Sequence, residues 1–318
     1  VNFSDKVTLS FDSLELLDSN SKKIDIKKPK VINAGLTISA EIPTLKDGSY
    51  IAVYTIVSAD SHVIKGAFSF SVGEGVGAQS QGQSEDQIAK LLADKKTSTV
   101  LRQSTLISQL LVFTSLAIII GAIAFRLLIV ERSFSKKQNR IFYLACILCI
   151  LATFLNIGFQ AAAQGSFSIL KAFSYDVLSQ EFQTYFGKIY LLRIVICILA
   201  IILWKFSKSN FVRIALVAAA WVLSLTPALT GHANSGEYQQ FSFILDVTHV
   251  IAASIWFGGL LLLPFFLKEK DYKDIVSKFS SIAFYCVIVI LGSGAFAFWR
   301  QTKSVVAGLH TFFGNLVI

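Results

Sequence analysis

Two long stretches without a charged side chain constrain the fold of this chain more than any other feature. Residues 103–125 carry no charge over 23 positions, and residues 141–170 carry none over 30. About 20 apolar residues are enough for a helix to cross the hydrocarbon core of a bilayer. Both stretches therefore predict membrane spans, and the extra length of the second predicts that its end forms part of a loop.

Further apolar segments follow at regular intervals. The composition agrees with them, because 54% of the residues are hydrophobic and only 15% are charged, which lies outside the range of soluble proteins. We expect a polytopic transmembrane helical bundle over 104–318, with about six complete spans and the start of a seventh near Leu309. The four other complete spans are expected at 186–204, 214–230, 247–267 and 279–299.

Basic residues are unevenly divided between the loops that join these spans. Twelve Lys and Arg residues lie around the loops after the first, third and fifth spans, against four on the other side. The basic side should be cytoplasmic, which predicts a multi-pass protein of the cytoplasmic membrane with its N-terminal domain outside. These loops account for much of the net charge of +9, so we expect the lipid bilayer as a partner and no nucleic acid.

Residues 1–73 have the pattern of a separate soluble domain. Apolar and polar residues alternate in "KVTLSF", "SLELLDS", "GSYIAVYTIVS" and "GAFSFSV", and turn-forming residues separate these segments. Such segments predict individual strands, and their spacing favours a small β-sandwich. Gly, Ser and Gln are frequent in the stretch that follows, so 74–103 is expected to be a flexible linker.

The four histidines gather on one side of this predicted topology. His62 lies in the outer domain, His232 at the outer end of the fourth span, His249 in the first turns of the fifth and His310 at the start of the seventh. Imidazole is a ligand for copper, zinc, iron and nickel. The clustering therefore predicts that the protein handles a metal at its outer side.

Two of these histidines have informative neighbours. Asp246 lies three positions before His249, so the two share a helix face, and a carboxylate near an imidazole can fix its tautomer for metal binding. The alternative is that Asp246 caps the helix and His249 packs at the interface. In "LTPALTGHANSGEY", Pro227 and Gly231 loosen the helix end and place His232 at its mouth; the alternative is a plain glycine turn with an incidental histidine.

The cysteines all lie within apolar segments, so no disulfide framework is expected. Cys146 and Cys149 share one face of the second span, and soft thiolates suit Cu(I). From the sequence we interpret them as small packing residues, and their role stays open.

The stretch "VSADSHVIKGAFSFSV" places a carboxylate and an imidazole on one turn. Asp60 and His62 precede a predicted strand, and an oxygen ligand with a nitrogen ligand suits Cu(II) or Zn(II). Two ligands make a weak site, so further donors must come from elsewhere. The alternative is that Asp60 is an ordinary turn residue and His62 its solvated neighbour.

Two motifs resemble copper-resistance families. "GSYIAVYTIVSADSHVIKGAFSFSVG" is similar to the end of the CopC domain, and "TPALTGHAN" with "LDVTHVIAASIWFGGLLLL" is similar to the core of the CopD membrane protein. The resemblance implies a cupredoxin-like, Ig-type sandwich that binds Cu(II) through Asp60 and His62. In the family, the remaining ligands come from a histidine at the mature N-terminus, which the resemblance places before Val1; we therefore expect this sequence to be an internal piece of a longer protein.

The resemblance also implies a function. The order of the two regions is that of fused copper import proteins, in which the outer domain captures Cu(II) and the membrane domain passes copper inward. His232, His249 and Asp246 are the candidates for the membrane path. We expect a transport protein and not an enzyme, with an unidentified extracytoplasmic copper chaperone as a further partner. The competing hypotheses are a haem-binding electron-transfer or metalloreductase protein and a surface module with a membrane anchor.

Overall fold

A computed structural model describes residues 1–59, 62–73, 87–93, 98–231 and 238–302 of the chain. The chain divides into two compact units, which are treated separately below. The first comprises the described parts of 1–108, 154–189 and 230–236, and the second those of 109–153, 190–229 and 237–318.

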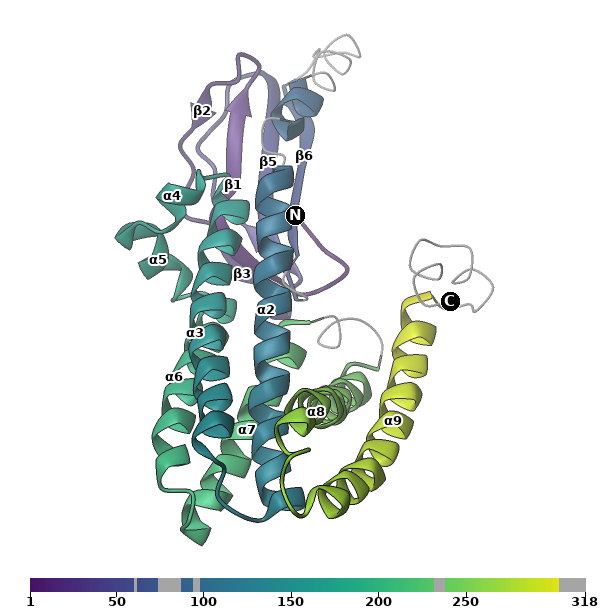
Figure 1. The fold of residues 1–318 in the computed structure, drawn as a ribbon. Coiled ribbons are helices and arrows are strands. Elements are labelled where there is room, and N and C mark those ends of the chain that lie inside the picture. Colours follow the sequence, from purple (N-terminus) through teal and green to yellow (C-terminus); the bar gives the residue numbers. More distant parts are fainter. Residues whose placement is uncertain (60–61, 74–86, 94–97, 232–237, 303–318) are drawn as a thin grey trace. The chain divides into compact units, whose positions relative to one another are not determined.

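The first unit contains the strands of the N-terminal domain (Figure 1). A four-stranded antiparallel sheet has the order β2-β1-β5-β6, and a separate two-stranded sheet pairs β3 with β4. The strands are β1 (Val7–Asp18), β2 (Lys23–Ile24), β3 (Lys30–Ile32), β4 (Thr37–Ser39), β5 (Gly48–Ser58) and β6 (Val63–Val72). The architecture is a curled antiparallel sheet, as expected for a small sandwich.

Strand β5 forms the centre of this domain because both of its faces are buried. Ile56 packs on one side with Val7 and Ile38, and the alternate residues Ile51 and Val53 pack on the other. Neighbouring side chains of a strand point to opposite faces, which is why a nearly continuous apolar run is buried here.

Two expectations for this region are corrected. The segments predicted as two strands form the single strand β1, whose pairing with β5 shifts register between Leu9 and Leu14; a bulge of this kind bends a strand without ending it. Residues 87–93, inside the predicted flexible linker, form a short helix. Its Ile88 and Leu91 pack against the cluster around Ile51, which explains its order.

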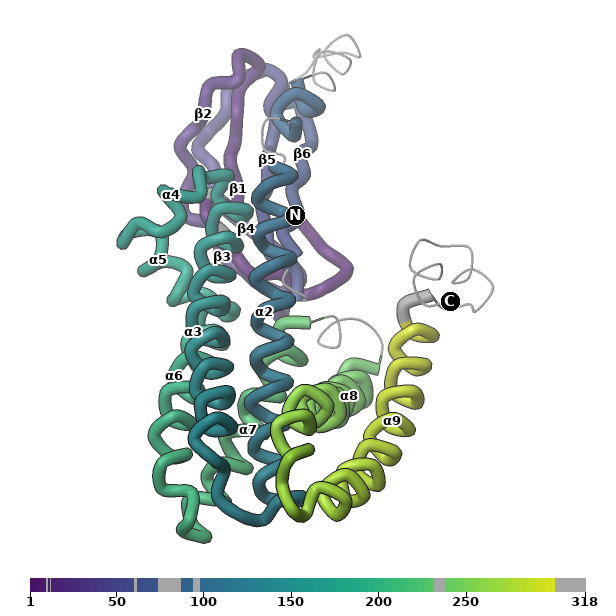
Figure 2. Tube along the Cα trace, in the orientation of Figure 1, coloured from purple at the N-terminus to yellow at the C-terminus, as the bar shows by residue number. Residues whose placement is uncertain are grey.

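In the part of the chain that the structure describes, six helices are long and apolar enough to span a membrane. The segment predicted to run over 141–170 ends at Gly165 and is followed by short helices, in agreement with the loop expected there. The chain follows the path in Figure 2 through α2 (Thr99–Ala124), η2 (Phe125–Val130), α3 (Lys136–Gly165), α4 (Ile169–Ala172), α5 (Tyr175–Glu181), α6 (Tyr185–Lys205), α7 (Asn210–Thr230), α8 (Gln239–Leu262), η4 (Leu263–Phe265) and α9 (Tyr272–Thr302).

Helices α2 and α8 approach each other closely in the second unit. A Cβ atom added to Gly121 would lie 2.8 Å from the Cα atom of Gly258, and one added to Gly258 would lie 2.1 Å from the carbonyl oxygen of Ala117. Small residues allow such backbone contact between membrane helices. The two glycines therefore fix the distance between α2 and α8.

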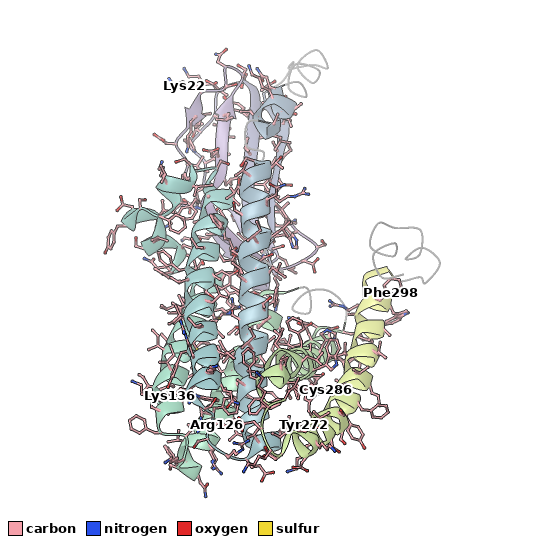
Figure 3. The ribbon with its side chains drawn as sticks, viewed as in Figure 1. Lys22, Arg126, Lys136, Tyr272, Cys286 and Phe298 are labelled. Carbon is pink, nitrogen blue, oxygen red and sulfur yellow. The ribbon has the colours of Figure 1, made fainter. Side chains whose placement is uncertain are left out.

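An aromatic cluster stabilises the end of the first span. Arg126, labelled in Figure 3, is buried in η2 and its guanidinium carbon lies 4.5 Å from the centroid of the Trp204 ring. Phe142 stacks on the same indole with the ring centroids 3.9 Å apart, and the indole nitrogen donates to Asn139 at 2.7 Å. A cation–π contact of this kind compensates in part for the burial of the Arg126 charge.

Candidate functional site

The turn between β5 and β6 holds the predicted outer ligands. The backbone nitrogen of Ser58 donates to the carbonyl oxygen of His62 at 2.9 Å, and the Ser58 hydroxyl donates to the same oxygen at 3.2 Å. These bonds close the hairpin directly after the pair Val57 and Val63. His62 is exposed at the end of this turn, whereas Asp60 lies outside the described residues.

A cavity of about 190 Å³ adjoins this turn. His62 lines it together with the carboxylate of Asp5 and the hydroxyl-bearing residues Ser4 and Ser58. Carboxylate oxygen and imidazole nitrogen together suit Cu(II) or Zn(II). Asp5 was missed in the sequence because it lies 57 positions before His62, and only the fold brings both residues to one cavity.

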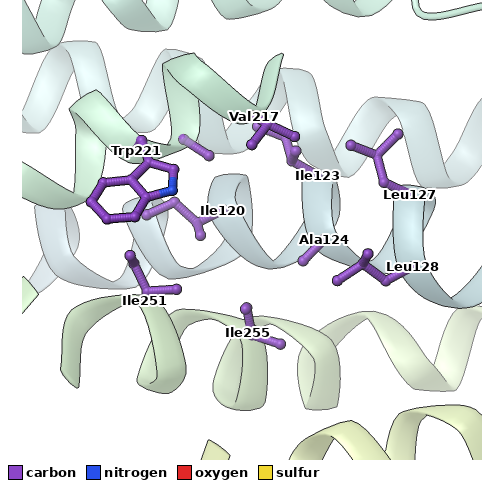
Figure 4. A pocket seen from close by; sticks show the side chains of 10 residues that line it. Ile120, Ile123, Ala124, Leu127, Leu128, Val217, Trp221, Ile251 and Ile255 are labelled. Carbon is purple, nitrogen blue, oxygen red and sulfur yellow. The ribbon is translucent and has the colours of Figure 1, made fainter. Parts of the chain in front are cut away.

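Figure 4 shows a second cavity, of about 220 Å³, which lies between α2, α7 and α8. Its lining is apolar, with Ile120, Ile123 and Leu127 from α2, Val217 and Trp221 from α7, and Ile251 and Ile255 from α8 among its residues. These side chains offer no carboxylate, imidazole or thiol. This cavity is therefore unsuited to holding a metal ion.

His249 is held by a neighbouring helix. Its Nδ1 atom lies 2.8 Å from the hydroxyl oxygen of Ser293 on α9. The Ser293 hydroxyl itself donates to the carbonyl oxygen of Val289 at 2.5 Å, so it accepts from His249 and places the imidazole proton on Nδ1. This leaves the lone pair on Nε2, the arrangement that metal-binding histidines adopt when a second group orients the ring.

Of the two other predicted membrane residues, the structure describes only Asp246. Asp246 is half-buried one turn before His249 on α8, as the spacing predicts. His232 lies outside the described residues. Arg193 is buried on α6, and its Nε atom donates to the hydroxyl of Thr226 at 2.9 Å.

A buried carboxyl group was not anticipated from the sequence. Glu181, at the end of α5, is fully buried, and its Oε1 atom accepts from the Nε2 atom of Gln164 at 3.3 Å. Within the described part of the chain, Glu181 Oε2 and Gln164 Oε1 have no hydrogen-bond partner. Burial raises the pKa of the Glu181 carboxyl to about 7, although the hydrogen bond from Gln164 opposes the rise.

Gln164 belongs to a polar face of α3 whose spacing can be recognised in the sequence. Thr153, Asn156, Gln160 and Gln164 follow one another at intervals of three or four residues and are all buried. Asn156 accepts from the hydroxyl of Ser108 on α2 at 3.3 Å. Polar residues on one face of a membrane helix point to the interior of a bundle. The spacing of these four residues therefore indicates a buried polar face, although it does not indicate Glu181 as the partner of Gln164.

The described residues contain no group of three or more His, Cys, Asp or Glu side chains close enough to hold a metal ion. His62 and His249 are therefore parts of candidate sites, and neither forms a complete set of ligands with other described residues.

Comparison with known proteins gives a consistent picture. Residues 1–73 match the CopC domain, and residues 101–240 match the N-terminal domain of copper resistance protein D-like proteins. The copper transport protein CutJ of Bacillus subtilis (strain 168) is 25% identical over 340 aligned residues, which cover 100% of this chain and 60% of CutJ. The inner membrane protein YebZ of Escherichia coli (strain K12) is 26% identical over 196 residues, covering 57% of this chain and 66% of YebZ. No solved structure matches.

Proposed function

Because this chain fuses a CopC domain to a copper resistance protein D-like N-terminal domain, we propose that it is a membrane copper transport protein and not an enzyme. The chain spans about 60% of the length of the relative that aligns with all of it, so the activity of the whole protein is part of the proposal. The observation that carries it is the fusion of the two domains in one chain, with an exposed histidine on the turn of the first and an oriented histidine in the second.

The outer domain, residues 1–73, is proposed to capture Cu(II) at the turn after β5. Asp60 and His62 supply an oxygen and a nitrogen ligand, and Asp5, which lines the same cavity as His62, is added as a third donor. Mixed oxygen and nitrogen ligation in a tetragonal arrangement is typical of Cu(II). An exposed turn at the edge of a rigid sheet suits a site that must receive and release its ion.

The membrane domain, residues 104–318, is proposed to pass copper across the bilayer. His249 is its best-supported ligand because Ser293 holds the Nδ1 proton and leaves Nε2 available. Asp246 shares the helix face of His249 and adds negative charge that attracts a cation. His232 is retained as a candidate from its position after α7.

The proposed location is the cytoplasmic membrane, with the N-terminal domain outside. This orientation is supported by the basic residues around the loops that follow η2, α6 and η4, which the positive-inside rule places in the cytoplasm. Copper ion and lipid are then the partners of the protein, and Cu(II) would meet the outer domain first.

The test of capture uses the intact protein purified from membranes and loaded with one equivalent of Cu(II). We expect electron paramagnetic resonance to show nitrogen hyperfine coupling from imidazole, and His62→Ala to remove most of it. Lys22→Ala, a change of an exposed side chain at the β1–β2 turn, is the control. Nitrogen coupling that persists at full strength in His62→Ala would contradict the proposed site.

A further inference from the structure

Two thiols from different helices meet inside the second unit. Cys149 on α3 and Cys197 on α6 are both fully buried members of the same core cluster, and their side chains lie close enough to interact. Both are free thiols. Their positions are 48 residues apart in the sequence, so the pairing is a property of the fold and not of the "CILC" motif that contains Cys149.

The surroundings of Cys149 are polar for a membrane interior. The hydroxyls of Ser115 on α2 and Thr153 on α3 face its sulfur, and both side chains are fully buried. The Thr153 hydroxyl has no well-formed hydrogen bond to any described residue. Cys146, one turn earlier on the same helix, is also fully buried. Buried polar atoms without partners are costly, which points to a ligand and not merely to packing.

A buried positive charge lies beside the thiols. Arg193 stands one turn before Cys197 on α6, is 3% exposed, and interacts electrostatically with both Cys149 and Cys197. Its guanidinium carbon lies 5.4 Å from the centroid of the Tyr190 ring. Among the described residues no carboxylate forms an ion pair with it. A buried guanidinium without an anion is unfavourable, and an anionic group at the thiols would neutralise it.

We propose that Cys149 and Cys197 form a cuprous-ion site in the membrane domain. Binding converts two thiols and one Cu(I) into a bis-thiolate complex of charge −1 and releases two protons, and Arg193 balances the charge of the complex. Soft thiolates select Cu(I), whereas structural zinc requires four ligands, which these residues do not supply. The inference relies on the proposed function in taking copper as the ion, and it replaces our interpretation of Cys149 as a packing residue.

The test measures Cu(I) binding by the intact protein in lipid nanodiscs, under anaerobic reducing conditions, against a chromophoric cuprous chelator. We expect one tightly bound equivalent, and a loss of affinity of at least about 100-fold in both Cys149→Ser and Cys197→Ser. Cys286→Ser is the matched control, because Cys286 is a buried thiol on α9, labelled in Figure 3, that belongs to a different helix. X-ray absorption of the wild-type complex should show sulfur as the nearest neighbour of copper.

Three results would overturn the proposal. They are unchanged Cu(I) affinity in both serine variants, a copper absorption spectrum without sulfur neighbours, or a disulfide between Cys149 and Cys197 that persists in protein isolated under reducing conditions. A serine variant that fails to fold is recognised by its thermal unfolding, and Arg193→Gln, which removes the balancing charge, then serves as the second probe with an expected loss of about 10-fold, whereas Arg193→Lys, which keeps the charge, should retain most of the affinity. Failure of the outer Cu(II) site in His62→Ala would leave the Cu(I) titration unaffected, so the two proposals can fail separately.

Discussion

The buried carboxyl of Glu181 makes the stability of this protein depend on pH. Its pKa is about 7 in the folded protein against an ordinary value of 4.5, so between these values the folded state holds a proton that the unfolded state has released. The contribution of the Glu181 carboxyl to the free energy of unfolding is therefore fully present below pH 4.5, and this contribution is lost as the pH rises through about 7. A difference of this size corresponds to roughly 3 kcal/mol of unfolding free energy.

The variant Glu181→Gln removes this dependence because an amide does not titrate. We expect the wild-type protein to lose stability between pH 5 and pH 8, and Glu181→Gln to remain nearly constant across that range, with the greatest gain over wild type at pH 8. Thermal unfolding in nanodiscs, followed by circular dichroism, measures both profiles. Asp176→Asn, which changes an exposed carboxylate on the same helix, is the control. Parallel profiles for wild type and Glu181→Gln would refute the reasoning.

Two other predictions concern helices α8 and α9. His249→Ala should reduce copper accumulation in cells expressing the protein by at least about 10-fold, and Ser293→Ala should produce a smaller loss because it removes only the group that orients the ring; equal accumulation in wild type and His249→Ala would remove this residue from the path. Gly258→Ala should destabilise the protein by about 1–3 kcal/mol because a methyl group there collides with the Ala117 backbone. Gly292→Ala, where an added Cβ atom meets nothing within 4 Å, should leave the melting temperature nearly unchanged, and similar losses in both variants would contradict the close approach.

The sequence predicted most of the architecture because the strongest signals are local. Long apolar segments, two of them without any charge, identified the six long helices of the described residues, and alternation identified β5 and β6. The division of β1 into two strands was wrong, since a shift in register between Leu9 and Leu14 looks the same in the sequence as a strand end. The short helix at 87–93 was missed because its order comes from two side chains that pack on the distant strand β5.

The candidate sites could be predicted only in part, for a related physical reason. The turn that carries His62 is local, so the candidate ligands Asp60 and His62 could be recognised from nearby positions, whereas Asp5 could not. Pairings such as Gln164 with Glu181 and His249 with Ser293 join separate helices, and nothing in the residues themselves specifies which helix faces meet. Cys149 meets Cys197 of α6 in the same core cluster for the same reason.

The contact between Gly121 and Gly258 has a mechanical consequence. Two backbones in direct contact cannot slide or roll past each other without steric clash, so α2 and α8 must move as one body. The neighbour α9 packs along α8, with a hydrogen bond between His249 and Ser293 and an edge-to-face contact between the rings of Phe241 and Phe296. Any rearrangement that changes the position of α8 must therefore carry α2 with it.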